Sequence, residues 1–193
     1  LGGGLYKNSV AGSDAAADCY FTTTAGSYLE AATDTAQTTC PSGDYCPAKT
    51  LNYNSVGGNI DCPGSYTAGG TGLKAQSECK ISVAGGKYVE TAKSSTLSTC
   101  ACGTYKGAHK VAYGSTSSCA TTSAGYYAAS GASTQTQASA GYYAAAGACA
   151  QTKVKAGCYA DEKGSAVECP KSCSDLGGGL YKNSVAGSDA AAD

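Results

Sequence analysis

Cysteine is the residue type whose number and spacing in this chain point most directly to chemistry. Twelve cysteines occur among the 193 residues, an even number that suits complete pairing into disulfides. A disulfide contributes roughly 2–4 kcal/mol of stability and forms in an oxidising compartment. We therefore predict an extracellular or cell-surface protein. The predicted disulfide cysteines are Cys19, Cys40, Cys46, Cys62, Cys79, Cys100, Cys102, Cys119, Cys149, Cys158, Cys169 and Cys173.

Two other uses of cysteine find little support in the spacing. A structural zinc site needs two knuckles with two to four residues between their cysteines, and only Cys169 and Cys173 have that spacing. A nucleophilic thiol needs a neighbouring base. The single histidine, His109, lies in the polar stretch GAHKVAYG, where we expect a solvated turn residue. We therefore expect no metal site, no cofactor and no enzymatic activity.

The glycine-rich and charged segments suggest no further site. Residues 2–4 (GGG) lack the Gly-Lys-Ser/Thr of a phosphate-binding loop, and residues 161–164 (DEKG) lack the alternating oxygens of a calcium loop. Calcium bridging by scattered carboxylates stays open. Thirteen lysines and 14 acidic residues are scattered without a basic stripe, and no apolar run approaches 18 residues. We expect no nucleic-acid partner and no membrane span in this segment.

The apolar composition cannot supply an ordinary core. Leu, Ile, Val and Phe together number 19, about a tenth of the chain, whereas about a fifth is the lower bound for typical folded domains. Gly, Ala, Ser and Thr dominate instead, so backbones can approach one another closely. Tyrosine rings and cystines are therefore expected to provide most of the buried surface.

The chain contains a long exact repeat. Residues 1–18, LGGGLYKNSVAGSDAAAD, return unchanged as residues 176–193. Residues 1–175 are therefore interpreted as one full tandem period, and residues 176–193 as the start of the next identical period. We expect both ends to be cuts in a longer polypeptide, with the two copies in equivalent positions one repeat apart. Long identical periods are typical of arrays and fibres.

A smaller repeat, Gly-x-Tyr, divides the period into nine modules of 16–22 residues. Nine motifs lie in the period, beginning at Gly4, and a tenth, Gly179-Leu180-Tyr181, opens the next period. The motif residues in the body of the chain are Gly26, Tyr28, Gly43, Tyr45, Gly64, Tyr66, Gly86, Tyr88, Gly103, Tyr105, Gly125, Tyr127, Gly141, Tyr143, Gly157 and Tyr159. Each motif predicts a short strand entered through a turn, because glycine allows backbone conformations closed to other residues.

One module is too small to bury its own face, so neighbouring modules must stack on it. We therefore predict a mostly β and irregular fold, a disulfide-rich tandem-repeat rod or solenoid of short strands and turns with little helix. The paired tyrosines Tyr126/Tyr127 and Tyr142/Tyr143 alternate across a strand, so one of each pair is expected to face outward.

An intermediate repeat of 60 residues makes predictions about the cysteines. Residues 19–45 align without gaps on residues 79–105, and the region around Tyr143 is interpreted as a third, eroded copy. Cys19 and Cys79 should then have the same kind of partner, and so should Cys40 and Cys100. Cys100 should not bond to Cys102, because one intervening residue does not allow ordinary disulfide geometry. Most bridges are expected to span less than about 25 residues, and sequence alone leaves the remaining pairing open.

Three segments resemble a known class of extracellular module. They are CPSGDYCPAKT (residues 40–50), CPGSYTAGG (62–70) and CACGTYKGA (100–108). These resemble the Cys-Pro-x-Gly-x-Tyr modules of growth-factor-receptor-like cysteine-rich repeats and, more closely, the surface (immobilisation) antigens of ciliated protists. The resemblance implies an extracellular disulfide-linked rod and implies no activity.

These observations lead to three functional hypotheses. The first is a structural subunit of an extracellular filament, whose partners are neighbouring copies of itself and its own glycans. The alternatives are a membrane-anchored surface-coat antigen, and an adhesive or ice-binding β-solenoid that uses rows of threonine. Exposed hydroxyls invite O-glycosylation. The candidate acceptors are Thr22, Thr23, Thr24, Thr38, Thr39, Ser94, Ser95 and Thr96.

Overall fold

In a computed structural model of the chain, which describes residues 8, 9, 11–176 and 185–189, the residues fall into two compact lobes. The first lobe consists of Leu1–Ser82, Thr91–Ser95 and Lys110–Thr116, and the second of Val83–Glu90, Thr96–His109 and Ser117–Asp193. The motifs at residues 4–6 and 179–181, and residues 2–4, lie outside the described residues.

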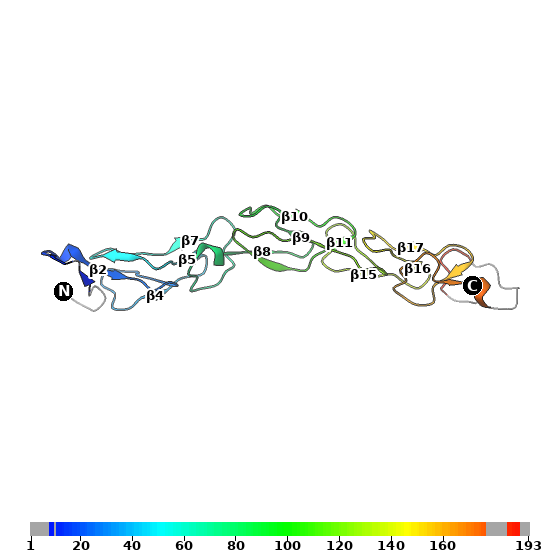
Figure 1. Cartoon of the computed structure of the whole chain (residues 1–193), viewed down its shortest axis with the longest axis horizontal. Coiled ribbons are helices and arrows are strands. Elements are labelled where there is room, and N and C mark those ends of the chain that lie inside the picture. Colours follow the sequence, from blue (N-terminus) through cyan, green and yellow to red (C-terminus); the bar gives the residue numbers. More distant parts are fainter. Residues whose placement is uncertain (1–7, 10, 177–184, 190–193) are drawn as a thin grey trace. The chain divides into compact units, whose positions relative to one another are not determined.

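The first lobe contains a three-stranded antiparallel sheet and two separate two-stranded antiparallel pairs (Figure 1). The sheet has the order β1-β2-β6, and Tyr20 on the central strand is paired with Asn8 on one side and Asn52 on the other. The two-stranded pairs join β3 with β4 and β5 with β7, and β6 lies between β5 and β7 in the chain. The strands are β1 (Asn8–Ser9), β2 (Cys19–Thr22), β3 (Ser27–Tyr28), β4 (Thr38–Thr39), β5 (Asp44–Tyr45), β6 (Thr50–Asn52) and β7 (Ile60–Asp61).

The second lobe is a series of two-stranded antiparallel pairs that follow one another in chain order in Figure 1. The pairs are β9 with β10, β11 with β13, β14 with β15, β16 with β17, and β18 with β19. The strands are β9 (Lys87–Tyr88), β10 (Ser98–Thr99), β11 (Thr104–Tyr105), β13 (Ala120–Thr121), β14 (Tyr126–Tyr127), β15 (Thr136–Gln137), β16 (Tyr142–Tyr143), β17 (Thr152–Lys153), β18 (Cys158–Tyr159) and β19 (Lys171–Ser172). One further pair joins β8 (Lys80–Val83) to β12 (His109–Ala112), and most of its residues belong to the first lobe.

Among the described residues, helix is confined to three single turns of 3-10 type, so this part of the chain is mostly strand and irregular backbone, as predicted. The turns are η1 (Ala16–Asp18), η2 (Gln76–Glu78) and η3 (Cys173–Leu176). Five disulfides connect segments within the lobes. The abundance of Gly, Ser and Thr explains the scarcity of helix, because none of these residues favours a helix interior.

Seven Gly-x-Tyr motifs form the same local structure. In each, the last two residues form a two-residue strand, namely β3, β5, β9, β11, β14, β16 or β18. The glycine before each strand has a φ between +75° and +99°, in the left-handed region. Glycine is the residue that reaches this region without steric cost, so it supplies the turn that leads into the strand. The eighth described motif differs, because Tyr66 lies outside the strands.

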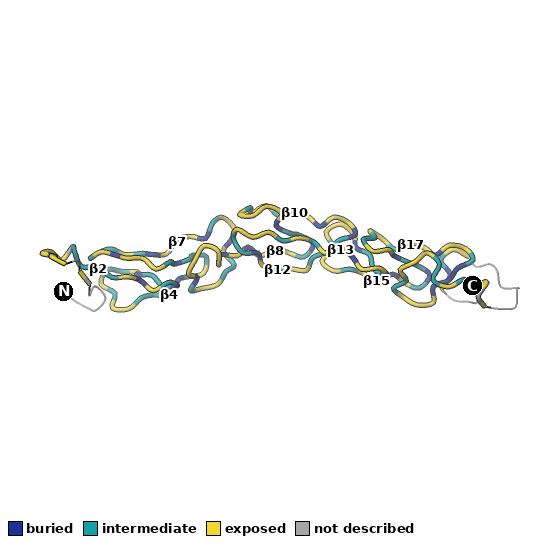
Figure 2. Tube along the Cα trace, in the orientation of Figure 1, coloured by how far each residue is buried: buried dark blue, intermediate teal, exposed yellow. Residues whose placement is uncertain are grey.

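Five motif glycines, namely Gly26, Gly86, Gly103, Gly125 and Gly141, are buried, and so are six of the residues that follow the motif tyrosines. The latter are at most 2 % exposed, and they are Leu29, Cys46, Val89, Ala128, Ala144 and Ala160. Among the described motif tyrosines only Tyr66 and Tyr159 are buried, and the other rings are half-buried. Of the tyrosine rings and cystines that were expected to provide most of the buried surface, the rings are thus mostly half-buried, whereas the bonded cysteines Cys40, Cys46, Cys62, Cys79, Cys100 and Cys158 are buried. Backbones here pack directly against one another, which leaves no room for a ring between them, and buried positions are spread along each lobe (Figure 2).

The paired tyrosines also differ from the prediction. Tyr126, Tyr127, Tyr142 and Tyr143 are all half-buried, so neither pair has one ring fully inward and one fully outward. In the last pair, Tyr143 packs against the buried cluster of Val154, Cys158 and Ala160.

The elements of the 60-residue alignment correspond closely. Residues 16–18 and 76–78 both form 3-10 turns, and strands β3, β4, β5 and β7 recur 60 residues later as β9, β10, β11 and β13. The backbone N–H groups of Tyr53 and Tyr113 donate to the carbonyls of Cys19 and Cys79, each at 2.8 Å. The two aligned segments thus adopt the same sequence of elements.

Candidate functional site

The feature that connects modules to one another is a set of four backbone hydrogen bonds, which we call a glycine junction. In the first lobe, the Gly26 N–H donates to the Cys46 carbonyl (2.7 Å) and the Cys40 N–H donates to the Gly26 carbonyl (2.9 Å). A second glycine, Gly72, donates to the Cys40 carbonyl (2.7 Å), and its neighbour Leu73 accepts from the Cys46 N–H (2.8 Å). The junction therefore links a Gly-x-Tyr glycine to a second glycine that lies 46 residues later.

The same four kinds of hydrogen bond recur with one motif glycine and one later glycine at each site. Each junction has four main residues: the motif glycine, the residue that accepts from the later glycine, the residue that accepts from the motif glycine, and the later glycine. In that order, the five junctions are Gly26/Cys40/Cys46/Gly72, Gly86/Cys100/Lys106/Gly131, Gly103/Thr122/Ala128/Gly147, Gly125/Ala138/Ala144/Gly164 and Gly141/Val154/Ala160/Gly187. Their hydrogen bonds measure 2.7–3.2 Å, within the ordinary range. Each junction lies within one lobe.

Glycine is required at the motif position by space as well as by φ. A Cβ built on Gly26, Gly86, Gly103, Gly125 or Gly141 would lie closer than 3.0 Å to the carbonyl oxygen of the later glycine. A backbone carbonyl cannot swing away as a flexible side chain can, so a larger residue would separate the two segments. The later glycines are covered instead by side chains, since a Cβ on Gly131 would lie 3.4 Å from the Thr99 methyl group.

The last junction involves the second copy of the repeated sequence. Gly187 donates to the Val154 carbonyl (3.0 Å), and Ser188 accepts from the Ala160 N–H (3.1 Å) and is only 2 % exposed. In the first copy, the identical residue Gly12 has nearly the same φ, +86° against +89°. No described atom lies within 4 Å of a Cβ built on Gly12. The same turn thus occurs in both copies, once in a junction and once with open space beside it.

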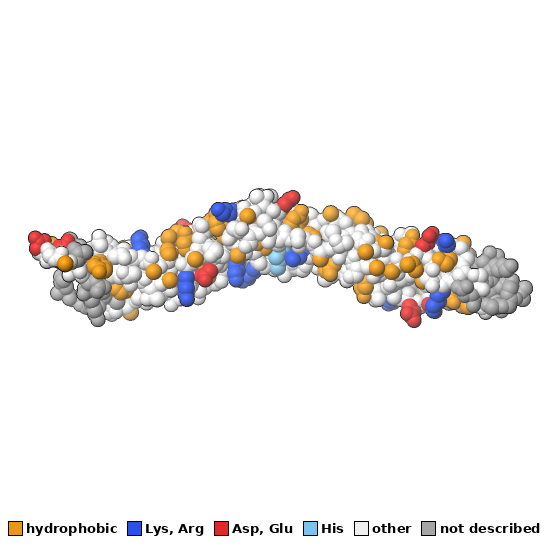
Figure 3. Space-filling view, in the orientation of Figure 1, with side chains coloured by type: hydrophobic (Ala, Val, Ile, Leu, Met, Phe, Trp, Pro, Cys, Tyr) orange, Lys and Arg blue, Asp and Glu red, His pale blue; other side chains and the backbone are white. Residues whose placement is uncertain are grey.

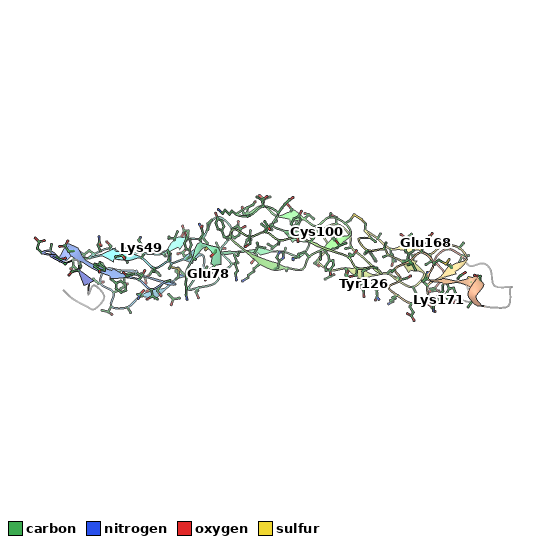
Figure 4. All side chains as sticks on the ribbon, in the orientation of Figure 1. Lys49, Glu78, Cys100, Tyr126, Glu168 and Lys171 are labelled. Atoms are coloured by element: carbon green, nitrogen blue, oxygen red, sulfur yellow. A yellow bond between two sulfur atoms is a disulfide. The ribbon has the colours of Figure 1, made fainter. Side chains whose placement is uncertain are left out.

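Ten cysteines form five disulfides. The bonds are Cys40–Cys46, Cys62–Cys79, Cys100–Cys119, Cys102–Cys149 and Cys158–Cys169. Four of them span 6–19 residues and the fifth spans 47, which confirms that most bridges are short. Cys100 and Cys102 bond to different partners, as expected. Cys100, labelled in Figure 4, is fully buried directly after β10.

The predicted equivalence of Cys40 and Cys100 is wrong. Cys40 bonds to Cys46, six residues later, whereas Cys100 bonds to Cys119, 19 residues later. The reason is that Lys106 stands 60 residues after Cys46, so the aligned copy has no cysteine at the near position. Cys40 and Cys100 therefore bond to cysteines at different positions relative to the 60-residue repeat.

Complete pairing of the twelve cysteines is not observed in this chain. Cys19, which is half-buried, and Cys173, which is 4 % exposed, are both free thiols. The expected equivalence of Cys19 and Cys79 is therefore not met within the chain, because Cys79 is bonded to Cys62.

His109 lies at the start of strand β12 and not in a turn, so that expectation is corrected. One ring nitrogen, Nδ1, is 2.9 Å from the Gly107 carbonyl, which fixes that nitrogen as a donor, and Nε2 is 3.0 Å from Ser117 Oγ. The same hydroxyl oxygen accepts the Val89 N–H at 3.0 Å. The imidazole and the hydroxyl thereby form hydrogen bonds with one another and with backbone groups, which is an ordinary role for a half-buried histidine.

Charged groups are dispersed and form a single ion pair among the described residues, between Lys171 Nζ and Asp161 Oδ2 at 2.6 Å. The hydrogen bond from Lys171 lowers the pKa of the Asp161 carboxyl and raises that of the ammonium group. The shallow hollow beside the pair is lined mainly by residues 160–165. In the part of the chain that the structure describes, no three His, Cys, Asp or Glu side chains converge on a metal site. Figure 3 shows the charges of each lobe as isolated groups.

The candidate O-glycosylation residues are mostly accessible, with one exception. Thr22, Thr24, Thr39, Ser95 and Thr96 are exposed, and Thr38 and Ser94 are half-buried. Thr23 is 1 % exposed, and its hydroxyl donates to the Lys49 carbonyl and accepts the Lys49 N–H. A sugar on Thr23 would break both hydrogen bonds, so we withdraw this residue from the predicted acceptors.

Sequence reasoning found the motif glycines but missed the later glycine of each junction. A usable signal exists, because the later glycine follows its partner by 39–46 residues in all five cases. No protein-family model matches the chain, and no curated protein matches it significantly. Among the described residues, no helix is both long and apolar enough to cross a membrane.

Proposed function

We propose that this protein is a structural subunit of an extracellular filament, in which successive 175-residue periods form a tandem-repeat rod of Gly-x-Tyr modules. The observation that carries the proposal is the glycine junction. The same backbone contacts recur at five sites, and the fifth is closed by Gly187, which belongs to the repeated sequence. A junction that uses the start of the next period can be extended indefinitely by further periods.

The chemistry of the chain supports a mechanical role outside the cell and not a catalytic one. Backbone hydrogen bonds at the glycine junctions, five disulfides and small buried side chains hold the segments together with few large apolar residues. Five disulfides are typical of proteins that fold in an oxidising compartment. Exposed hydroxyls such as those of Thr22, Ser95 and Thr96 would carry the glycan coat of the filament.

Electron microscopy of the native material tests this proposal. The expected result is continuous filaments whose axial repeat corresponds to one 175-residue period, with sugar on peptides that contain the exposed acceptors. Discrete particles without an axial repeat would contradict the filament. Release of such particles from a membrane by a phospholipase that cleaves glycosylphosphatidylinositol would favour the membrane-anchored antigen instead.

A further inference from the structure

The two free cysteines each match one half of the disulfide Cys62–Cys79. Cys62 directly follows strand β7, and Cys173 directly follows strand β19. Their N–H groups donate to motif glycines in the same way, Cys62 to Gly43 at 2.7 Å and Cys173 to Gly157 at 3.0 Å. Both are nearly inaccessible, at 5 % and 4 % exposure. Cys173 therefore occupies the same kind of position as Cys62, directly after the second strand of a pair, which is also the position of Cys40 and Cys100.

The other free cysteine, Cys19, occupies the structural position of Cys79. Each directly follows a 3-10 turn, η1 or η2, and its N–H donates to the first residue of that turn. The last residue of each turn accepts a backbone hydrogen bond from four residues earlier, Asp18 Oδ2 from the Asp14 N–H at 3.3 Å and Glu78 Oε2 from the Lys74 N–H at 2.5 Å. Cys79 uses this position to reach Cys62, with 5.7 Å between the two Cα atoms.

The chain between the two positions is also matched. Gly72, in the junction of Gly26, precedes Cys79 by seven residues, and Gly12 precedes Cys19 by the same seven residues. Gly187, in the junction of Gly141, repeats Gly12 in the second copy. If the chain after Gly187 follows the same path as the chain after Gly72, it places a cysteine seven residues later, in the position of Cys79. In the 175-residue period that cysteine is the next copy of Cys19.

We propose that Cys173 forms a disulfide with the Cys19 that opens the following period, so that consecutive periods are joined covalently as well as through a glycine junction. The partner is a second copy of this sequence. The inference rests on the proposed function only in requiring that the 175-residue period continues. It explains why the chain holds one unpaired cysteine of each kind, and why complete pairing fails within a single period.

The bond requires an oxidant, which we take to be a low-molecular-weight disulfide such as oxidised glutathione. The thiolate of one cysteine attacks the glutathione disulfide, forms a mixed disulfide and releases one glutathione. The second cysteine then attacks the protein sulfur of the mixed disulfide and releases the other glutathione. Two thiols lose two protons and two electrons, and one oxidised glutathione becomes two reduced molecules.

Peptide mapping of the native material without reduction tests the bond directly. Cleavage after Lys and Glu isolates the two cysteines, because residues 8–30 contain only Cys19 and residues 172–182 contain only Cys173. We expect these two peptides to be recovered as one disulfide-linked species. Recovery of both as free, alkylated thiols, or linked to other cysteines, would overturn the inference. Because filaments with an axial repeat could still be seen in that case, the two proposals fail separately.

A matched set of three recombinant chains gives a second test. The 193-residue chain, refolded with oxidised and reduced glutathione, is expected to keep two thiols, Cys19 and Cys173. Addition of Cys-Tyr-Phe-Thr after Asp193, which repeats residues 19–22, should lower the count to one thiol per chain. The same extended chain with Cys173→Ser should keep two thiols, those of Cys19 and of the added cysteine. Three thiols in the extended chain, with the five internal disulfides intact by mass, would overturn the inference.

Discussion

Replacing Gly125 by alanine is expected to destabilise the second lobe more than an alanine at a glycine of similar backbone conformation. Gly125 has a φ of +83°, and a Cβ added there would lie closer than 3.0 Å to the Gly164 carbonyl oxygen. The control is Gly147→Ala in the same lobe. Gly147 has a φ of +74°, and its nearest neighbour would be a methyl carbon 3.5 Å from the new Cβ, an ordinary contact.

The magnitude follows from these contacts. Left-handed backbone costs an L-residue roughly 1–2 kcal/mol, and both substitutions carry this cost. Displacing Gly164 from Gly125 also breaks the 2.8 Å hydrogen bond from the Gly164 N–H to the carbonyl of Ala138, a residue with no exposed surface. A buried carbonyl without a partner costs about 1–3 kcal/mol. We therefore expect a loss of about 2–5 kcal/mol for Gly125→Ala and about 1–2 kcal/mol for the control.

The assay is a urea titration of each variant with its disulfides intact, followed by tyrosine fluorescence, since the chain has no tryptophan. The linear dependence on urea gives the free energy of unfolding in water. Equal destabilisation by Gly125→Ala and Gly147→Ala would refute the reasoning, because it would mean that backbone conformation alone, and not the close approach of Gly164, requires glycine at the motif position.

Three further substitutions have defined outcomes. Cys149→Ser opens a 47-residue loop and should lower the free energy of unfolding by about 4 kcal/mol, against about 3 kcal/mol for the 11-residue loop opened by Cys169→Ser; a reversed order in urea titrations would contradict the loop-length account. Burial and a neighbouring tyrosine raise the pKa of Tyr66. The stability that the protonated Tyr66 hydroxyl contributes is therefore complete below its ordinary pKa of about 10 and is lost as the pH rises through its pKa in the folded protein. Tyr66→Phe should remove this loss of stability at alkaline pH, as measured by urea titrations at different pH. Thr23→Val should cost about 1–3 kcal/mol because two backbone hydrogen bonds lose their partner, whereas the exposed Thr24→Val should cost little, and equal losses would contradict the assigned role.

The local structure was predictable from the sequence because it depends on neighbouring residues. A glycine before each x-Tyr pair predicts a turn and then a strand, and seven motifs have this structure. The low aliphatic content predicts disulfides and little helix. The separation of Cys100 from Cys102 follows from the geometry of one intervening residue.

The long-range contacts were not predictable in the same way. The partner of Gly26 is Gly72, and no pattern within either module identifies the other. The residue after a motif tyrosine is a buried Leu, Cys, Val or Ala in six motifs but is Lys106 or Thr67 in two others, so its type gives no clear signal. The sequence shows that Lys106 stands where the first copy has Cys46, but it does not show that Cys100 bonds to Cys119 instead. These features depend on which backbones approach one another in the folded chain.

The surroundings of Gly12 in the native material test the central claim most directly. A density map of the material at side-chain resolution would show whether every copy of the repeated sequence is in the same environment. We predict that Gly12 lies against Gly141 of the preceding period, with its N–H donated to the carbonyl of Val154, as Gly187 does here. If Gly12 faces solvent in the interior of the assembly, periods are not joined through glycine junctions and the account is contradicted.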